Sequence, residues 1–337
     1  MPQKSFRQAL NEALHHEMAR DPTVIVLGED IAGGAGASGQ QDAWGGAFGV
    51  TKGLLGAFGP MRVRDTPISE SAFVGAAAGA AITGLRPVAE IMFVDFLGVC
   101  FDQIFNQAAK FRYMFGGKAV TPFVLRATYG AGTRSASQHS QALYPIFTHV
   151  PGLKVVIPSN PYDAKGLLIQ AIRDNDPVIF LENKLLYDTV AEVPDGAYAV
   201  PLGEANVLRE GGDATIVAIG RMVHFAQDAA ALLAAEGIDC TVVDPRTTSP
   251  LDEDTILETA EETGRVIVVD EANPRCGMAA DISSIIAENA FGALKAPIMK
   301  VTVPHTPVPY APNLEAAYLP DAKRIAEAVR KTMAYRK

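Results

Sequence analysis

Residues 24–30 read VIVLGED, and this stretch decides the fold class. Four apolar residues in a row, three of them β-branched, predict a buried strand of the kind found inside parallel sheets. Gly28 ends the strand, and two acidic residues follow it. A helical stripe with a spacing of four residues precedes the strand, formed by Phe6, Leu10, Leu14 and Met18.

The same alternation of β-branched runs and helical patterns continues along the chain, which is typical of parallel sheets with crossover helices. Between 191 and 204 the periodicity fades, and prolines and glycines interrupt it. We therefore predict an α/β protein of two domains, residues 1–190 and 205–337, joined by the linker 191–204. Each domain should hold a mostly parallel sheet flanked by helices. The strands expected after the first are 87–94, 121–126, 153–158, 177–182, 214–219, 238–244, 265–270 and 297–303. Helices are expected between most of them, including one at 101–113 and one that the Asn160-Pro161 pair starts and that runs to about 174.

Composition excludes several classes of protein. The 337 residues include 29 Lys and Arg against 38 Asp and Glu, a net charge of −9, which argues against nucleic acid or an anionic membrane as partner. No apolar run approaches the ~18 residues of a membrane span, and the N-terminal sequence has no signal-peptide core. The cysteines are isolated, which fits a reducing cytoplasm.

Four segments follow predicted strands and are therefore where a ligand is expected. In open α/β sheets, ligands bind beyond the carboxyl ends of the strands. That rule selects 28–30, 65–70, 93–96 and the long loop 127–141. Two residues in these segments have a simpler explanation: Glu70 would complement a helix dipole behind a capping Ser69, and His139 would be a solvated loop residue. From the residues alone, both explanations stay open.

Familiar phosphate-binding and catalytic motifs are missing from the chain. Residues 34–39 match G-x-G-x-x-G in letters, but they do not join a strand directly to a helix. Neither a GxSxG elbow nor HExxH occurs, and Gly211-Gly212-Asp213 has the wrong order for a diphosphate-anchoring motif. The sequence thus offers acid and base candidates without a phosphate anchor of its own.

Several longer segments resemble a known family in order and spacing over essentially the whole chain. They are similar to the beta subunit of the thiamine-diphosphate-dependent dehydrogenase component of 2-oxo acid and acetoin dehydrogenase complexes. Within that family, residues 33–46, 221–224 and 271–276 look most like acetoin dehydrogenase. The segments that carry the resemblance to the family are 65–70 (DTPISE), 138–141 (QHSQ), 151–156 (PGLKVV) and 171–177 (AIRDNDP).

The resemblance implies a pyrimidine-binding first domain and a transketolase-like C-terminal domain. It also implies a heterotetramer of two alpha and two beta chains, with thiamine diphosphate shared between an alpha and a beta subunit. The alpha subunit would hold Mg²⁺ and the diphosphate, which explains the missing anchor. The C-terminal half would meet the dihydrolipoyl acyltransferase core.

The resemblance also assigns roles to residues. Glu70 matches the glutamate that bonds N1′ of the aminopyrimidine and drives its proton exchange, and burial should raise its pKa. His139 matches the histidine that orients or protonates substrate and intermediate or guides the lipoyl acceptor. Phe96 falls where an aromatic residue contacts the pyrimidine, and Glu29 matches an acid near the cofactor. A structural potassium site is implied at Phe123, Ala171, Ile172, Asp174 and Asp176.

The expected reaction is cleavage of acetoin to acetaldehyde, with transfer of the oxidised two-carbon unit to lipoamide. The nearest alternative keeps this chemistry but takes pyruvate or a branched-chain 2-oxo acid. Three further classes are a self-sufficient transketolase-type transferase, a non-catalytic assembly subunit and a nicotinamide dehydrogenase. The first is disfavoured by the missing diphosphate motif, and the last depends only on residues 34–39.

Overall fold

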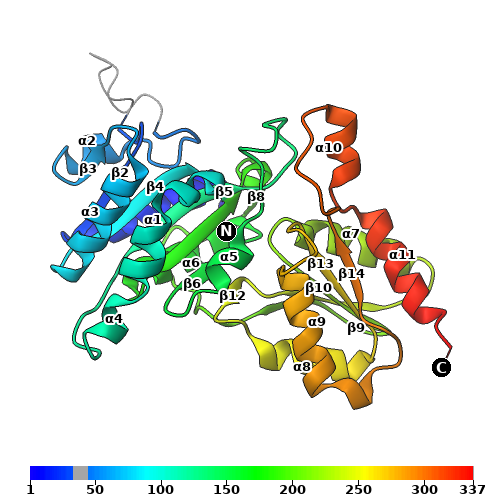
Figure 1. The fold of residues 1–337 in the computed structure, drawn as a ribbon. Coiled ribbons are helices and arrows are strands. Elements are labelled where there is room, and N and C mark those ends of the chain that lie inside the picture. The colour runs from blue at the N-terminus through cyan, green and yellow to red at the C-terminus, as the bar shows by residue number, and fades with distance from the viewer. Residues whose placement is uncertain (33–44, 337) are drawn as a thin grey trace. The chain divides into compact units, whose positions relative to one another are not determined.

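The computed structural model describes residues 1–32 and 45–336. The chain divides into two compact units. The first unit contains residues 1–129 and 146–202, and the second contains 130–145 and 203–337. Both units alternate strands and helices, which confirms the predicted fold class (Figure 1). Among the described residues, no helix combines the length and the apolar character needed to cross a membrane.

The first unit is built on a parallel sheet with the strand order β6-β7-β5-β4-β2-β3. Because all these strands run the same way, their carboxyl ends meet at one edge. Strand β5 begins three residues later than expected, since Pro122 has no amide hydrogen to donate to a ladder. The strands are β2 (Val24–Gly28), β3 (Val63–Asp65), β4 (Arg86–Phe93), β5 (Val124–Tyr129), β6 (Lys154–Val156) and β7 (Val178–Asn183).

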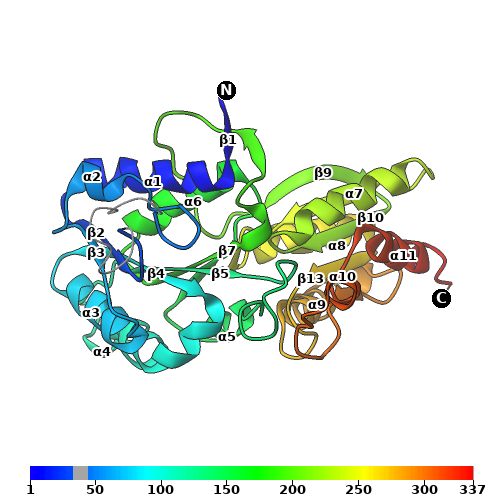
Figure 2. The same ribbon diagram turned by 90° about the horizontal axis from the view of Figure 1, so that it is seen from above.

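Helices cover both faces of this sheet (Figure 2). Helix α1 (Phe6–Arg20) and helix α6 (Pro161–Arg173) pack together on one face, and the predicted stripe of α1 is fully buried there. Helix α6 starts as the sequence predicts, because the Asn160 side chain accepts the Asp163 amide at 2.9 Å. The remaining helices are α2 (Leu54–Phe58), α3 (Glu70–Ile82), α4 (Phe111–Met114) and α5 (Tyr144–Thr148).

The single helix expected at 101–113 is wrong. The chain instead forms a 3-10 segment η1 (Val94–Cys100), a π-helical turn η2 (Gln103–Ala108) and the short helix α4. Part of the reason lies in packing against α3, where a Cβ at Gly75 would lie 2.7 Å from Gln103 Oε1. A regular 3.6-residue pattern in the sequence does not show such a close approach by another helix.

The segment expected as a linker packs on the first unit. Its first residues belong to β8 (Val190–Glu192), which pairs antiparallel with β1 (Gln3–Ser5), and the turn η3 (Lys184–Leu186) precedes it. Further on, the Val200 amide donates to the Gly166 carbonyl at 3.1 Å. Only glycine fits there, because a Cβ at Gly166 would lie 2.5 Å from the Val200 side chain. The unit boundary therefore falls after residue 202.

The second unit contains a sheet in the order β14-β13-β10-β11-β9, with only β9 antiparallel to its neighbour. Helices α7 and α11 bury a common apolar core against the sheet, and α8 and α9 also pack against its strands. The strands of this sheet are β9 (Asn206–Gly212), β10 (Ala214–Ala218), β11 (Cys240–Asp244), β13 (Val266–Asp270) and β14 (Met299–Thr302). The short strand β12 (Thr247–Ser249) is not part of it. The helical segments are α7 (Met222–Ala234), α8 (Glu253–Thr263), α9 (Met278–Asn289), η4 (Phe291–Ala293), α10 (Pro312–Tyr318) and α11 (Ala322–Met333).

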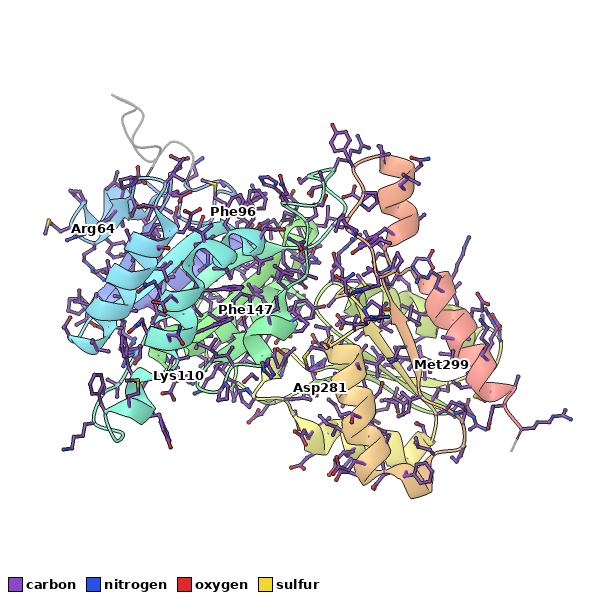
Figure 3. The ribbon with its side chains drawn as sticks, viewed as in Figure 1. Arg64, Phe96, Lys110, Phe147, Asp281 and Met299 are labelled. Carbon is purple, nitrogen blue, oxygen red and sulfur yellow. The ribbon has the colours of Figure 1, made fainter. Side chains whose placement is uncertain are left out.

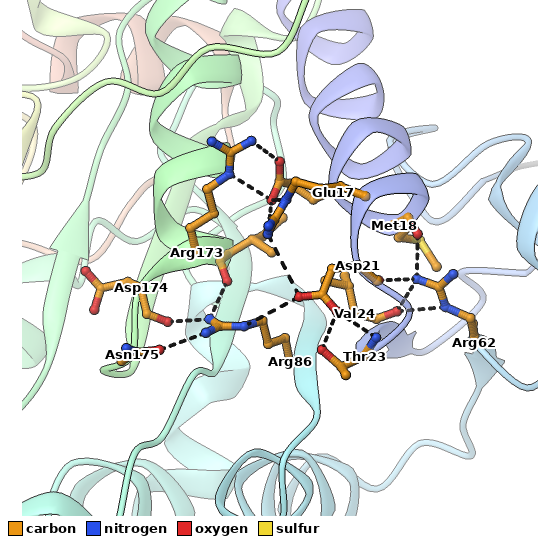
Figure 4. A network of polar contacts seen from close by, with 12 residues as sticks. Glu17, Met18, Asp21, Thr23, Val24, Arg62, Arg86, Arg173, Asp174 and Asn175 are labelled. Atoms are coloured by element: carbon orange, nitrogen blue, oxygen red, sulfur yellow. Dashed lines mark hydrogen bonds and ion pairs between the residues drawn. The ribbon is translucent and has the colours of Figure 1, made fainter.

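A buried carboxylate joins α1 and α6, which cover one face of the first sheet (Figure 4). Glu17 on α1 is fully buried and accepts two hydrogen bonds from Arg173 on α6, at 2.7 and 3.0 Å. It also accepts the Arg20 side chain at 2.9 Å. The Glu17 carboxylate raises the pKa of Arg173, although burial opposes this. The pair thus links sequence segments that are far apart.

We predict that Glu17→Ala lowers the free energy of unfolding by about 1–3 kcal/mol, because charge-assisted hydrogen bonds between α1 and α6 are lost. The two arginines are partly exposed and water can solvate them, which limits the cost. Urea denaturation measures the change. The matched control is Glu327→Ala, which removes an exposed ion pair with Lys331 and should leave the midpoint in place. Equal midpoints for the wild type and Glu17→Ala would contradict the account.

Candidate active site

Two of the predicted acids come together at the carboxyl edge of the first sheet. Glu29 directly follows β2, and Glu70 is the first residue of α3. The Ser69 amide donates a hydrogen bond to the Glu29 carboxylate, so the start of α3 is tied to the end of β2. Gly28 is needed at this edge, because a Cβ there would lie 2.6 Å from the Glu90 carbonyl oxygen.

The surroundings of Glu29 disfavour its negative charge. The residue is 9% exposed. Its Oε1 atom is buried and has no hydrogen-bond partner in the part of the chain that the structure describes. Burial raises the pKa of Glu29, and the negative charges of Glu70 and Asp30 raise it further. A buried acceptor that lacks a donor is costly in a finished protein, so it marks a place where a bound group would donate.

Glu70 lies in the first turn of α3, where its negative charge complements the helix dipole. The Ser69 hydroxyl makes no cap to the first turn of α3 and donates instead to the Pro67 carbonyl at 3.1 Å. The expectation that Ser69 caps this helix is therefore wrong, because the side chain turns back along the loop. Glu70 itself is half-buried at the helix N-terminus. Its carboxylate lies close enough to Glu29 for their charges to interact.

Phe96 lies in the same unit, in the 3-10 segment that follows β4 (Figure 3). Its ring makes an edge contact with Phe93 at 5.5 Å between centroids, and Phe93 makes a similar contact with Phe48 at 5.8 Å. This aromatic row holds Phe96 by one side while the residue stays half-buried. The ring can therefore offer surface to a flat ligand.

His139 belongs to the second unit. It lies in the segment 130–145, which the contacts group with residues 203–337 although its neighbours in sequence belong to the first unit. The residue is half-buried, and Ser140 beside it is 2% exposed. The histidine is thus partly covered by the protein and partly open to solvent. The structure thus brings Glu29 and Glu70 together and places His139 in a different unit.

The oxygens implied for potassium already have partners within the chain. Arg86 donates to the carbonyls of Ile172 at 3.0 Å and Asp174 at 2.8 Å (Figure 4). The Phe123 carbonyl accepts the Val178 amide, and the Ala171 carbonyl accepts the Asp174 amide. The carboxylates of Asp174 and Asp176 bond Lys154 and Arg112, respectively. Within residues 1–32 and 45–336, no group of three His, Cys, Asp or Glu side chains is arranged to hold a metal ion. A potassium ion at these residues stays a prediction. In this structure the Arg86 guanidinium supplies a positive charge beside the carbonyls of Ile172 and Asp174.

Sequence reasoning missed a buried ionic cluster below this edge. Arg126 on β5 bonds Glu90 on β4 at 2.6 Å and Glu182 on β7 at 2.7 and 2.8 Å. Burial raises the pKa of Glu90 despite the guanidinium beside it, and Glu182 adds to the rise. A signal was present in the sequence, because Glu90, Arg126 and Glu182 each lie inside a strand between buried neighbours. The glycine-rich residues 34–39 lie outside the described part of the chain.

Two family models match the chain. Residues 2–189 match the family model "Transketolase, pyrimidine binding domain", and residues 203–325 match "Transketolase, C-terminal domain". The chain therefore belongs to the transketolase-like family of thiamine-diphosphate-dependent enzymes. A solved structure described as a split gene transketolase, an inactive beta4 tetramer, superposes with a TM-score of 0.76 at 25% identity, covering 99% of each chain.

The similar curated proteins are enzyme subunits. The chain is 66% identical over 329 residues to the beta subunit of acetoin:2,6-dichlorophenolindophenol oxidoreductase from Cupriavidus necator, covering 98% of this chain and 97% of the relative. The corresponding Bacillus subtilis subunit is 57% identical, covering 95% and 94%. The pyruvate dehydrogenase E1 component subunit beta of Rickettsia felis is 46% identical, covering 99% of both chains.

The residues at the sheet edge fit the aminopyrimidine of the family's cofactor. The ring carries nitrogen atoms that can donate hydrogen bonds to carboxylates. Glu29 Oε1 is a carboxylate oxygen that has no donor among residues 1–32 and 45–336. Phe96 offers an aromatic surface in the same unit. The carboxylate and the aromatic side chain at this edge thus suit a ring that donates hydrogen bonds rather than a phosphate group.

We predict that Glu29→Gln raises the thermal unfolding temperature at pH 7.5 and leaves it unchanged below about pH 4.5. The pKa of Glu29 is higher in the folded chain than the ordinary glutamate value of 4.5, so the folded state binds the proton more tightly. Stability is therefore lost as the pH rises through the folded-state pKa, and the neutral amide does not suffer this loss. Calorimetry across this pH range measures it. A lower unfolding temperature for Glu29→Gln at pH 7.5 would count against an uncompensated carboxylate.

Proposed function

We propose that this chain is the beta subunit of a thiamine-diphosphate-dependent acetoin dehydrogenase. It would cleave acetoin to acetaldehyde and pass the oxidised two-carbon unit to lipoamide. The observation that carries the proposal is the carboxylate pair Glu29 and Glu70 inside a domain of the pyrimidine-binding family, where one Glu29 oxygen has no donor among the described residues. The identity to acetoin-oxidising subunits exceeds that to the pyruvate dehydrogenase subunit, which supports acetoin over a 2-oxo acid.

The proposed mechanism divides the work between cofactor and protein. Thiamine diphosphate, when bound, supplies the carbanion and the electron sink for carbon–carbon cleavage. Glu70 holds and exchanges a proton at N1′ of the aminopyrimidine, which general acid–base catalysis requires from a group in hydrogen-bond contact. Glu29 keeps the local electrostatic potential negative and accepts a hydrogen bond from the ring. Phe96 packs against the ring, and His139 gives or takes the substrate proton.

The assembly is part of the proposal. Its relatives are named as beta subunits, which points to an alpha partner, and we propose two alpha and two beta chains. The alpha chain would hold Mg²⁺ and the diphosphate, and the C-terminal unit would meet the dihydrolipoyl acyltransferase core. We also propose a cytoplasmic complex, because all three cysteines are free thiols.

The test is dye reduction by the chain reassembled with its alpha subunit, Mg²⁺ and thiamine diphosphate. We expect turnover of acetoin to exceed that of pyruvate and of a branched 2-oxo acid at matched concentrations. Preference for either 2-oxo acid would keep the site and move the substrate. No turnover on any of the three would overturn the proposal.

We predict that Glu70→Gln lowers kcat by about 10²- to 10⁴-fold, because the amide cannot exchange a proton with the ring. The matched control is Glu253→Gln, which alters a carboxylate in the first turn of another helix, α8, and should keep full activity. Retained turnover in Glu70→Gln would favour a non-catalytic role for this chain.

A further inference from the structure

The loop that carries His139 is closed at its base and anchored to the second unit. The Gly130 amide donates to the Gln141 carbonyl at 3.2 Å, so residues 131–140 project from a neck. Ala131 is buried in a small apolar cluster with Val303, Val308 and Tyr318. A loop of this length needs such attachments to hold one conformation.

A buried carboxylate from helix α10 binds the loop backbone. Glu315 is 3% exposed, and its Oε1 accepts the Gly132 amide at 2.7 Å. The Arg134 amide lies 3.1 and 3.2 Å from the two oxygens of the same carboxylate. Gly132 and Arg134 have positive φ angles of 110° and 57°, which turn their amides toward one anion. The loop forms an anion-binding nest, and the anion is a side chain of the second unit.

Two more carboxylates hold the ends of the loop. Glu271 accepts the Ala131 amide at 2.7 Å. At the other end, the Tyr144 hydroxyl donates to Asp270, which is fully buried and also accepts the Ala272 amide at 2.8 Å. Glu271 and Asp270 follow each other at the end of β13, so a single strand end supports both sides of the neck. Hydrogen bonds to charged acceptors are stronger than those between neutral groups.

We infer that Glu315 is a positioning residue for His139: its carboxylate fixes the backbone of the histidine loop and thereby places the imidazole for proton transfer. This inference rests on the proposed function, because His139 acts on substrate only there. Catalytic geometry is sensitive to small displacements, and a shift of about 1 Å can cost roughly 100-fold in rate. A neutral amide at this position offers one acceptor oxygen to two amides and carries no charge.

The test compares Glu315→Gln, His139→Ala and the double variant in the enzyme reassembled with its alpha subunit. Glu315→Gln should lower kcat for acetoin about 10- to 100-fold. The affinity for thiamine diphosphate should not change, since Glu29 and Glu70 belong to the first unit. In the His139→Ala background, Glu315→Gln should cost nothing further, because the histidine that it positions is gone. Glu327→Gln on α11, whose partner is Lys331, is the control.

Hydrogen–deuterium exchange of the peptide covering 130–141 gives a readout that needs no activity. Exchange should accelerate in Glu315→Gln and stay at the wild-type rate in Glu327→Gln. Should Glu315→Gln fail to fold, Glu271→Gln takes its place, with the same expected loss in kcat and the same loss of additivity.

The possible failures are distinct. Inactive wild-type enzyme on all substrates would overturn the proposed function and leave the exchange experiment to decide the anchoring. Unchanged exchange, unchanged kcat or multiplying effects of the two substitutions would overturn the inference.

Discussion

Arg126 is fully buried between two carboxylates, and the candidate site depends on this arrangement. The guanidinium joins Glu90 on β4 to Glu182 on β7 through bonds of 2.6–2.8 Å. Buried charges are tolerated only when they satisfy one another, so the three strands cannot slip in register without a large penalty. Glu90 pairs in register with Gly28, directly before Glu29. The ionic cluster therefore fixes the position of the end of β2, which Glu29 directly follows.

A second constraint is that the candidate site residues belong to different units of the chain. The carboxylate pair belongs to the first unit, whereas the histidine loop is held by carboxylates of the second. In both places a negative side chain meets backbone amides: Glu29 accepts the Ser69 amide, and Glu315 accepts two amides of the loop. Glu29 keeps one oxygen without a partner among the described residues, which is the feature expected of a group that awaits a ligand. The oxygens of Glu315 accept amides of the loop, so this carboxylate fixes the conformation of the loop.

Local patterns predicted what depends on local physics. The stripe of α1, the cap of α6 and the buried strand β2 are visible because periodicity and capping act over a few residues. The break of the helix expected at 101–113 could not be seen, since it involves close packing against α3. Glu70 and His139 were predicted through resemblance, and composition alone left both open. Glu315 had no signal, because its partner Gly132 lies 183 residues away in the chain.

The central claim is that the Glu29–Glu70 edge of this chain receives the aminopyrimidine ring. A structure of the assembled alpha and beta chains with thiamine diphosphate tests it most directly. We expect N1′ within about 2.6–3.2 Å of a Glu70 oxygen, with Phe96 against the ring. We also expect a donor within hydrogen-bond distance of Glu29 Oε1. A ring bound elsewhere, with Glu29 still unpartnered and Glu70 facing water, would contradict the account.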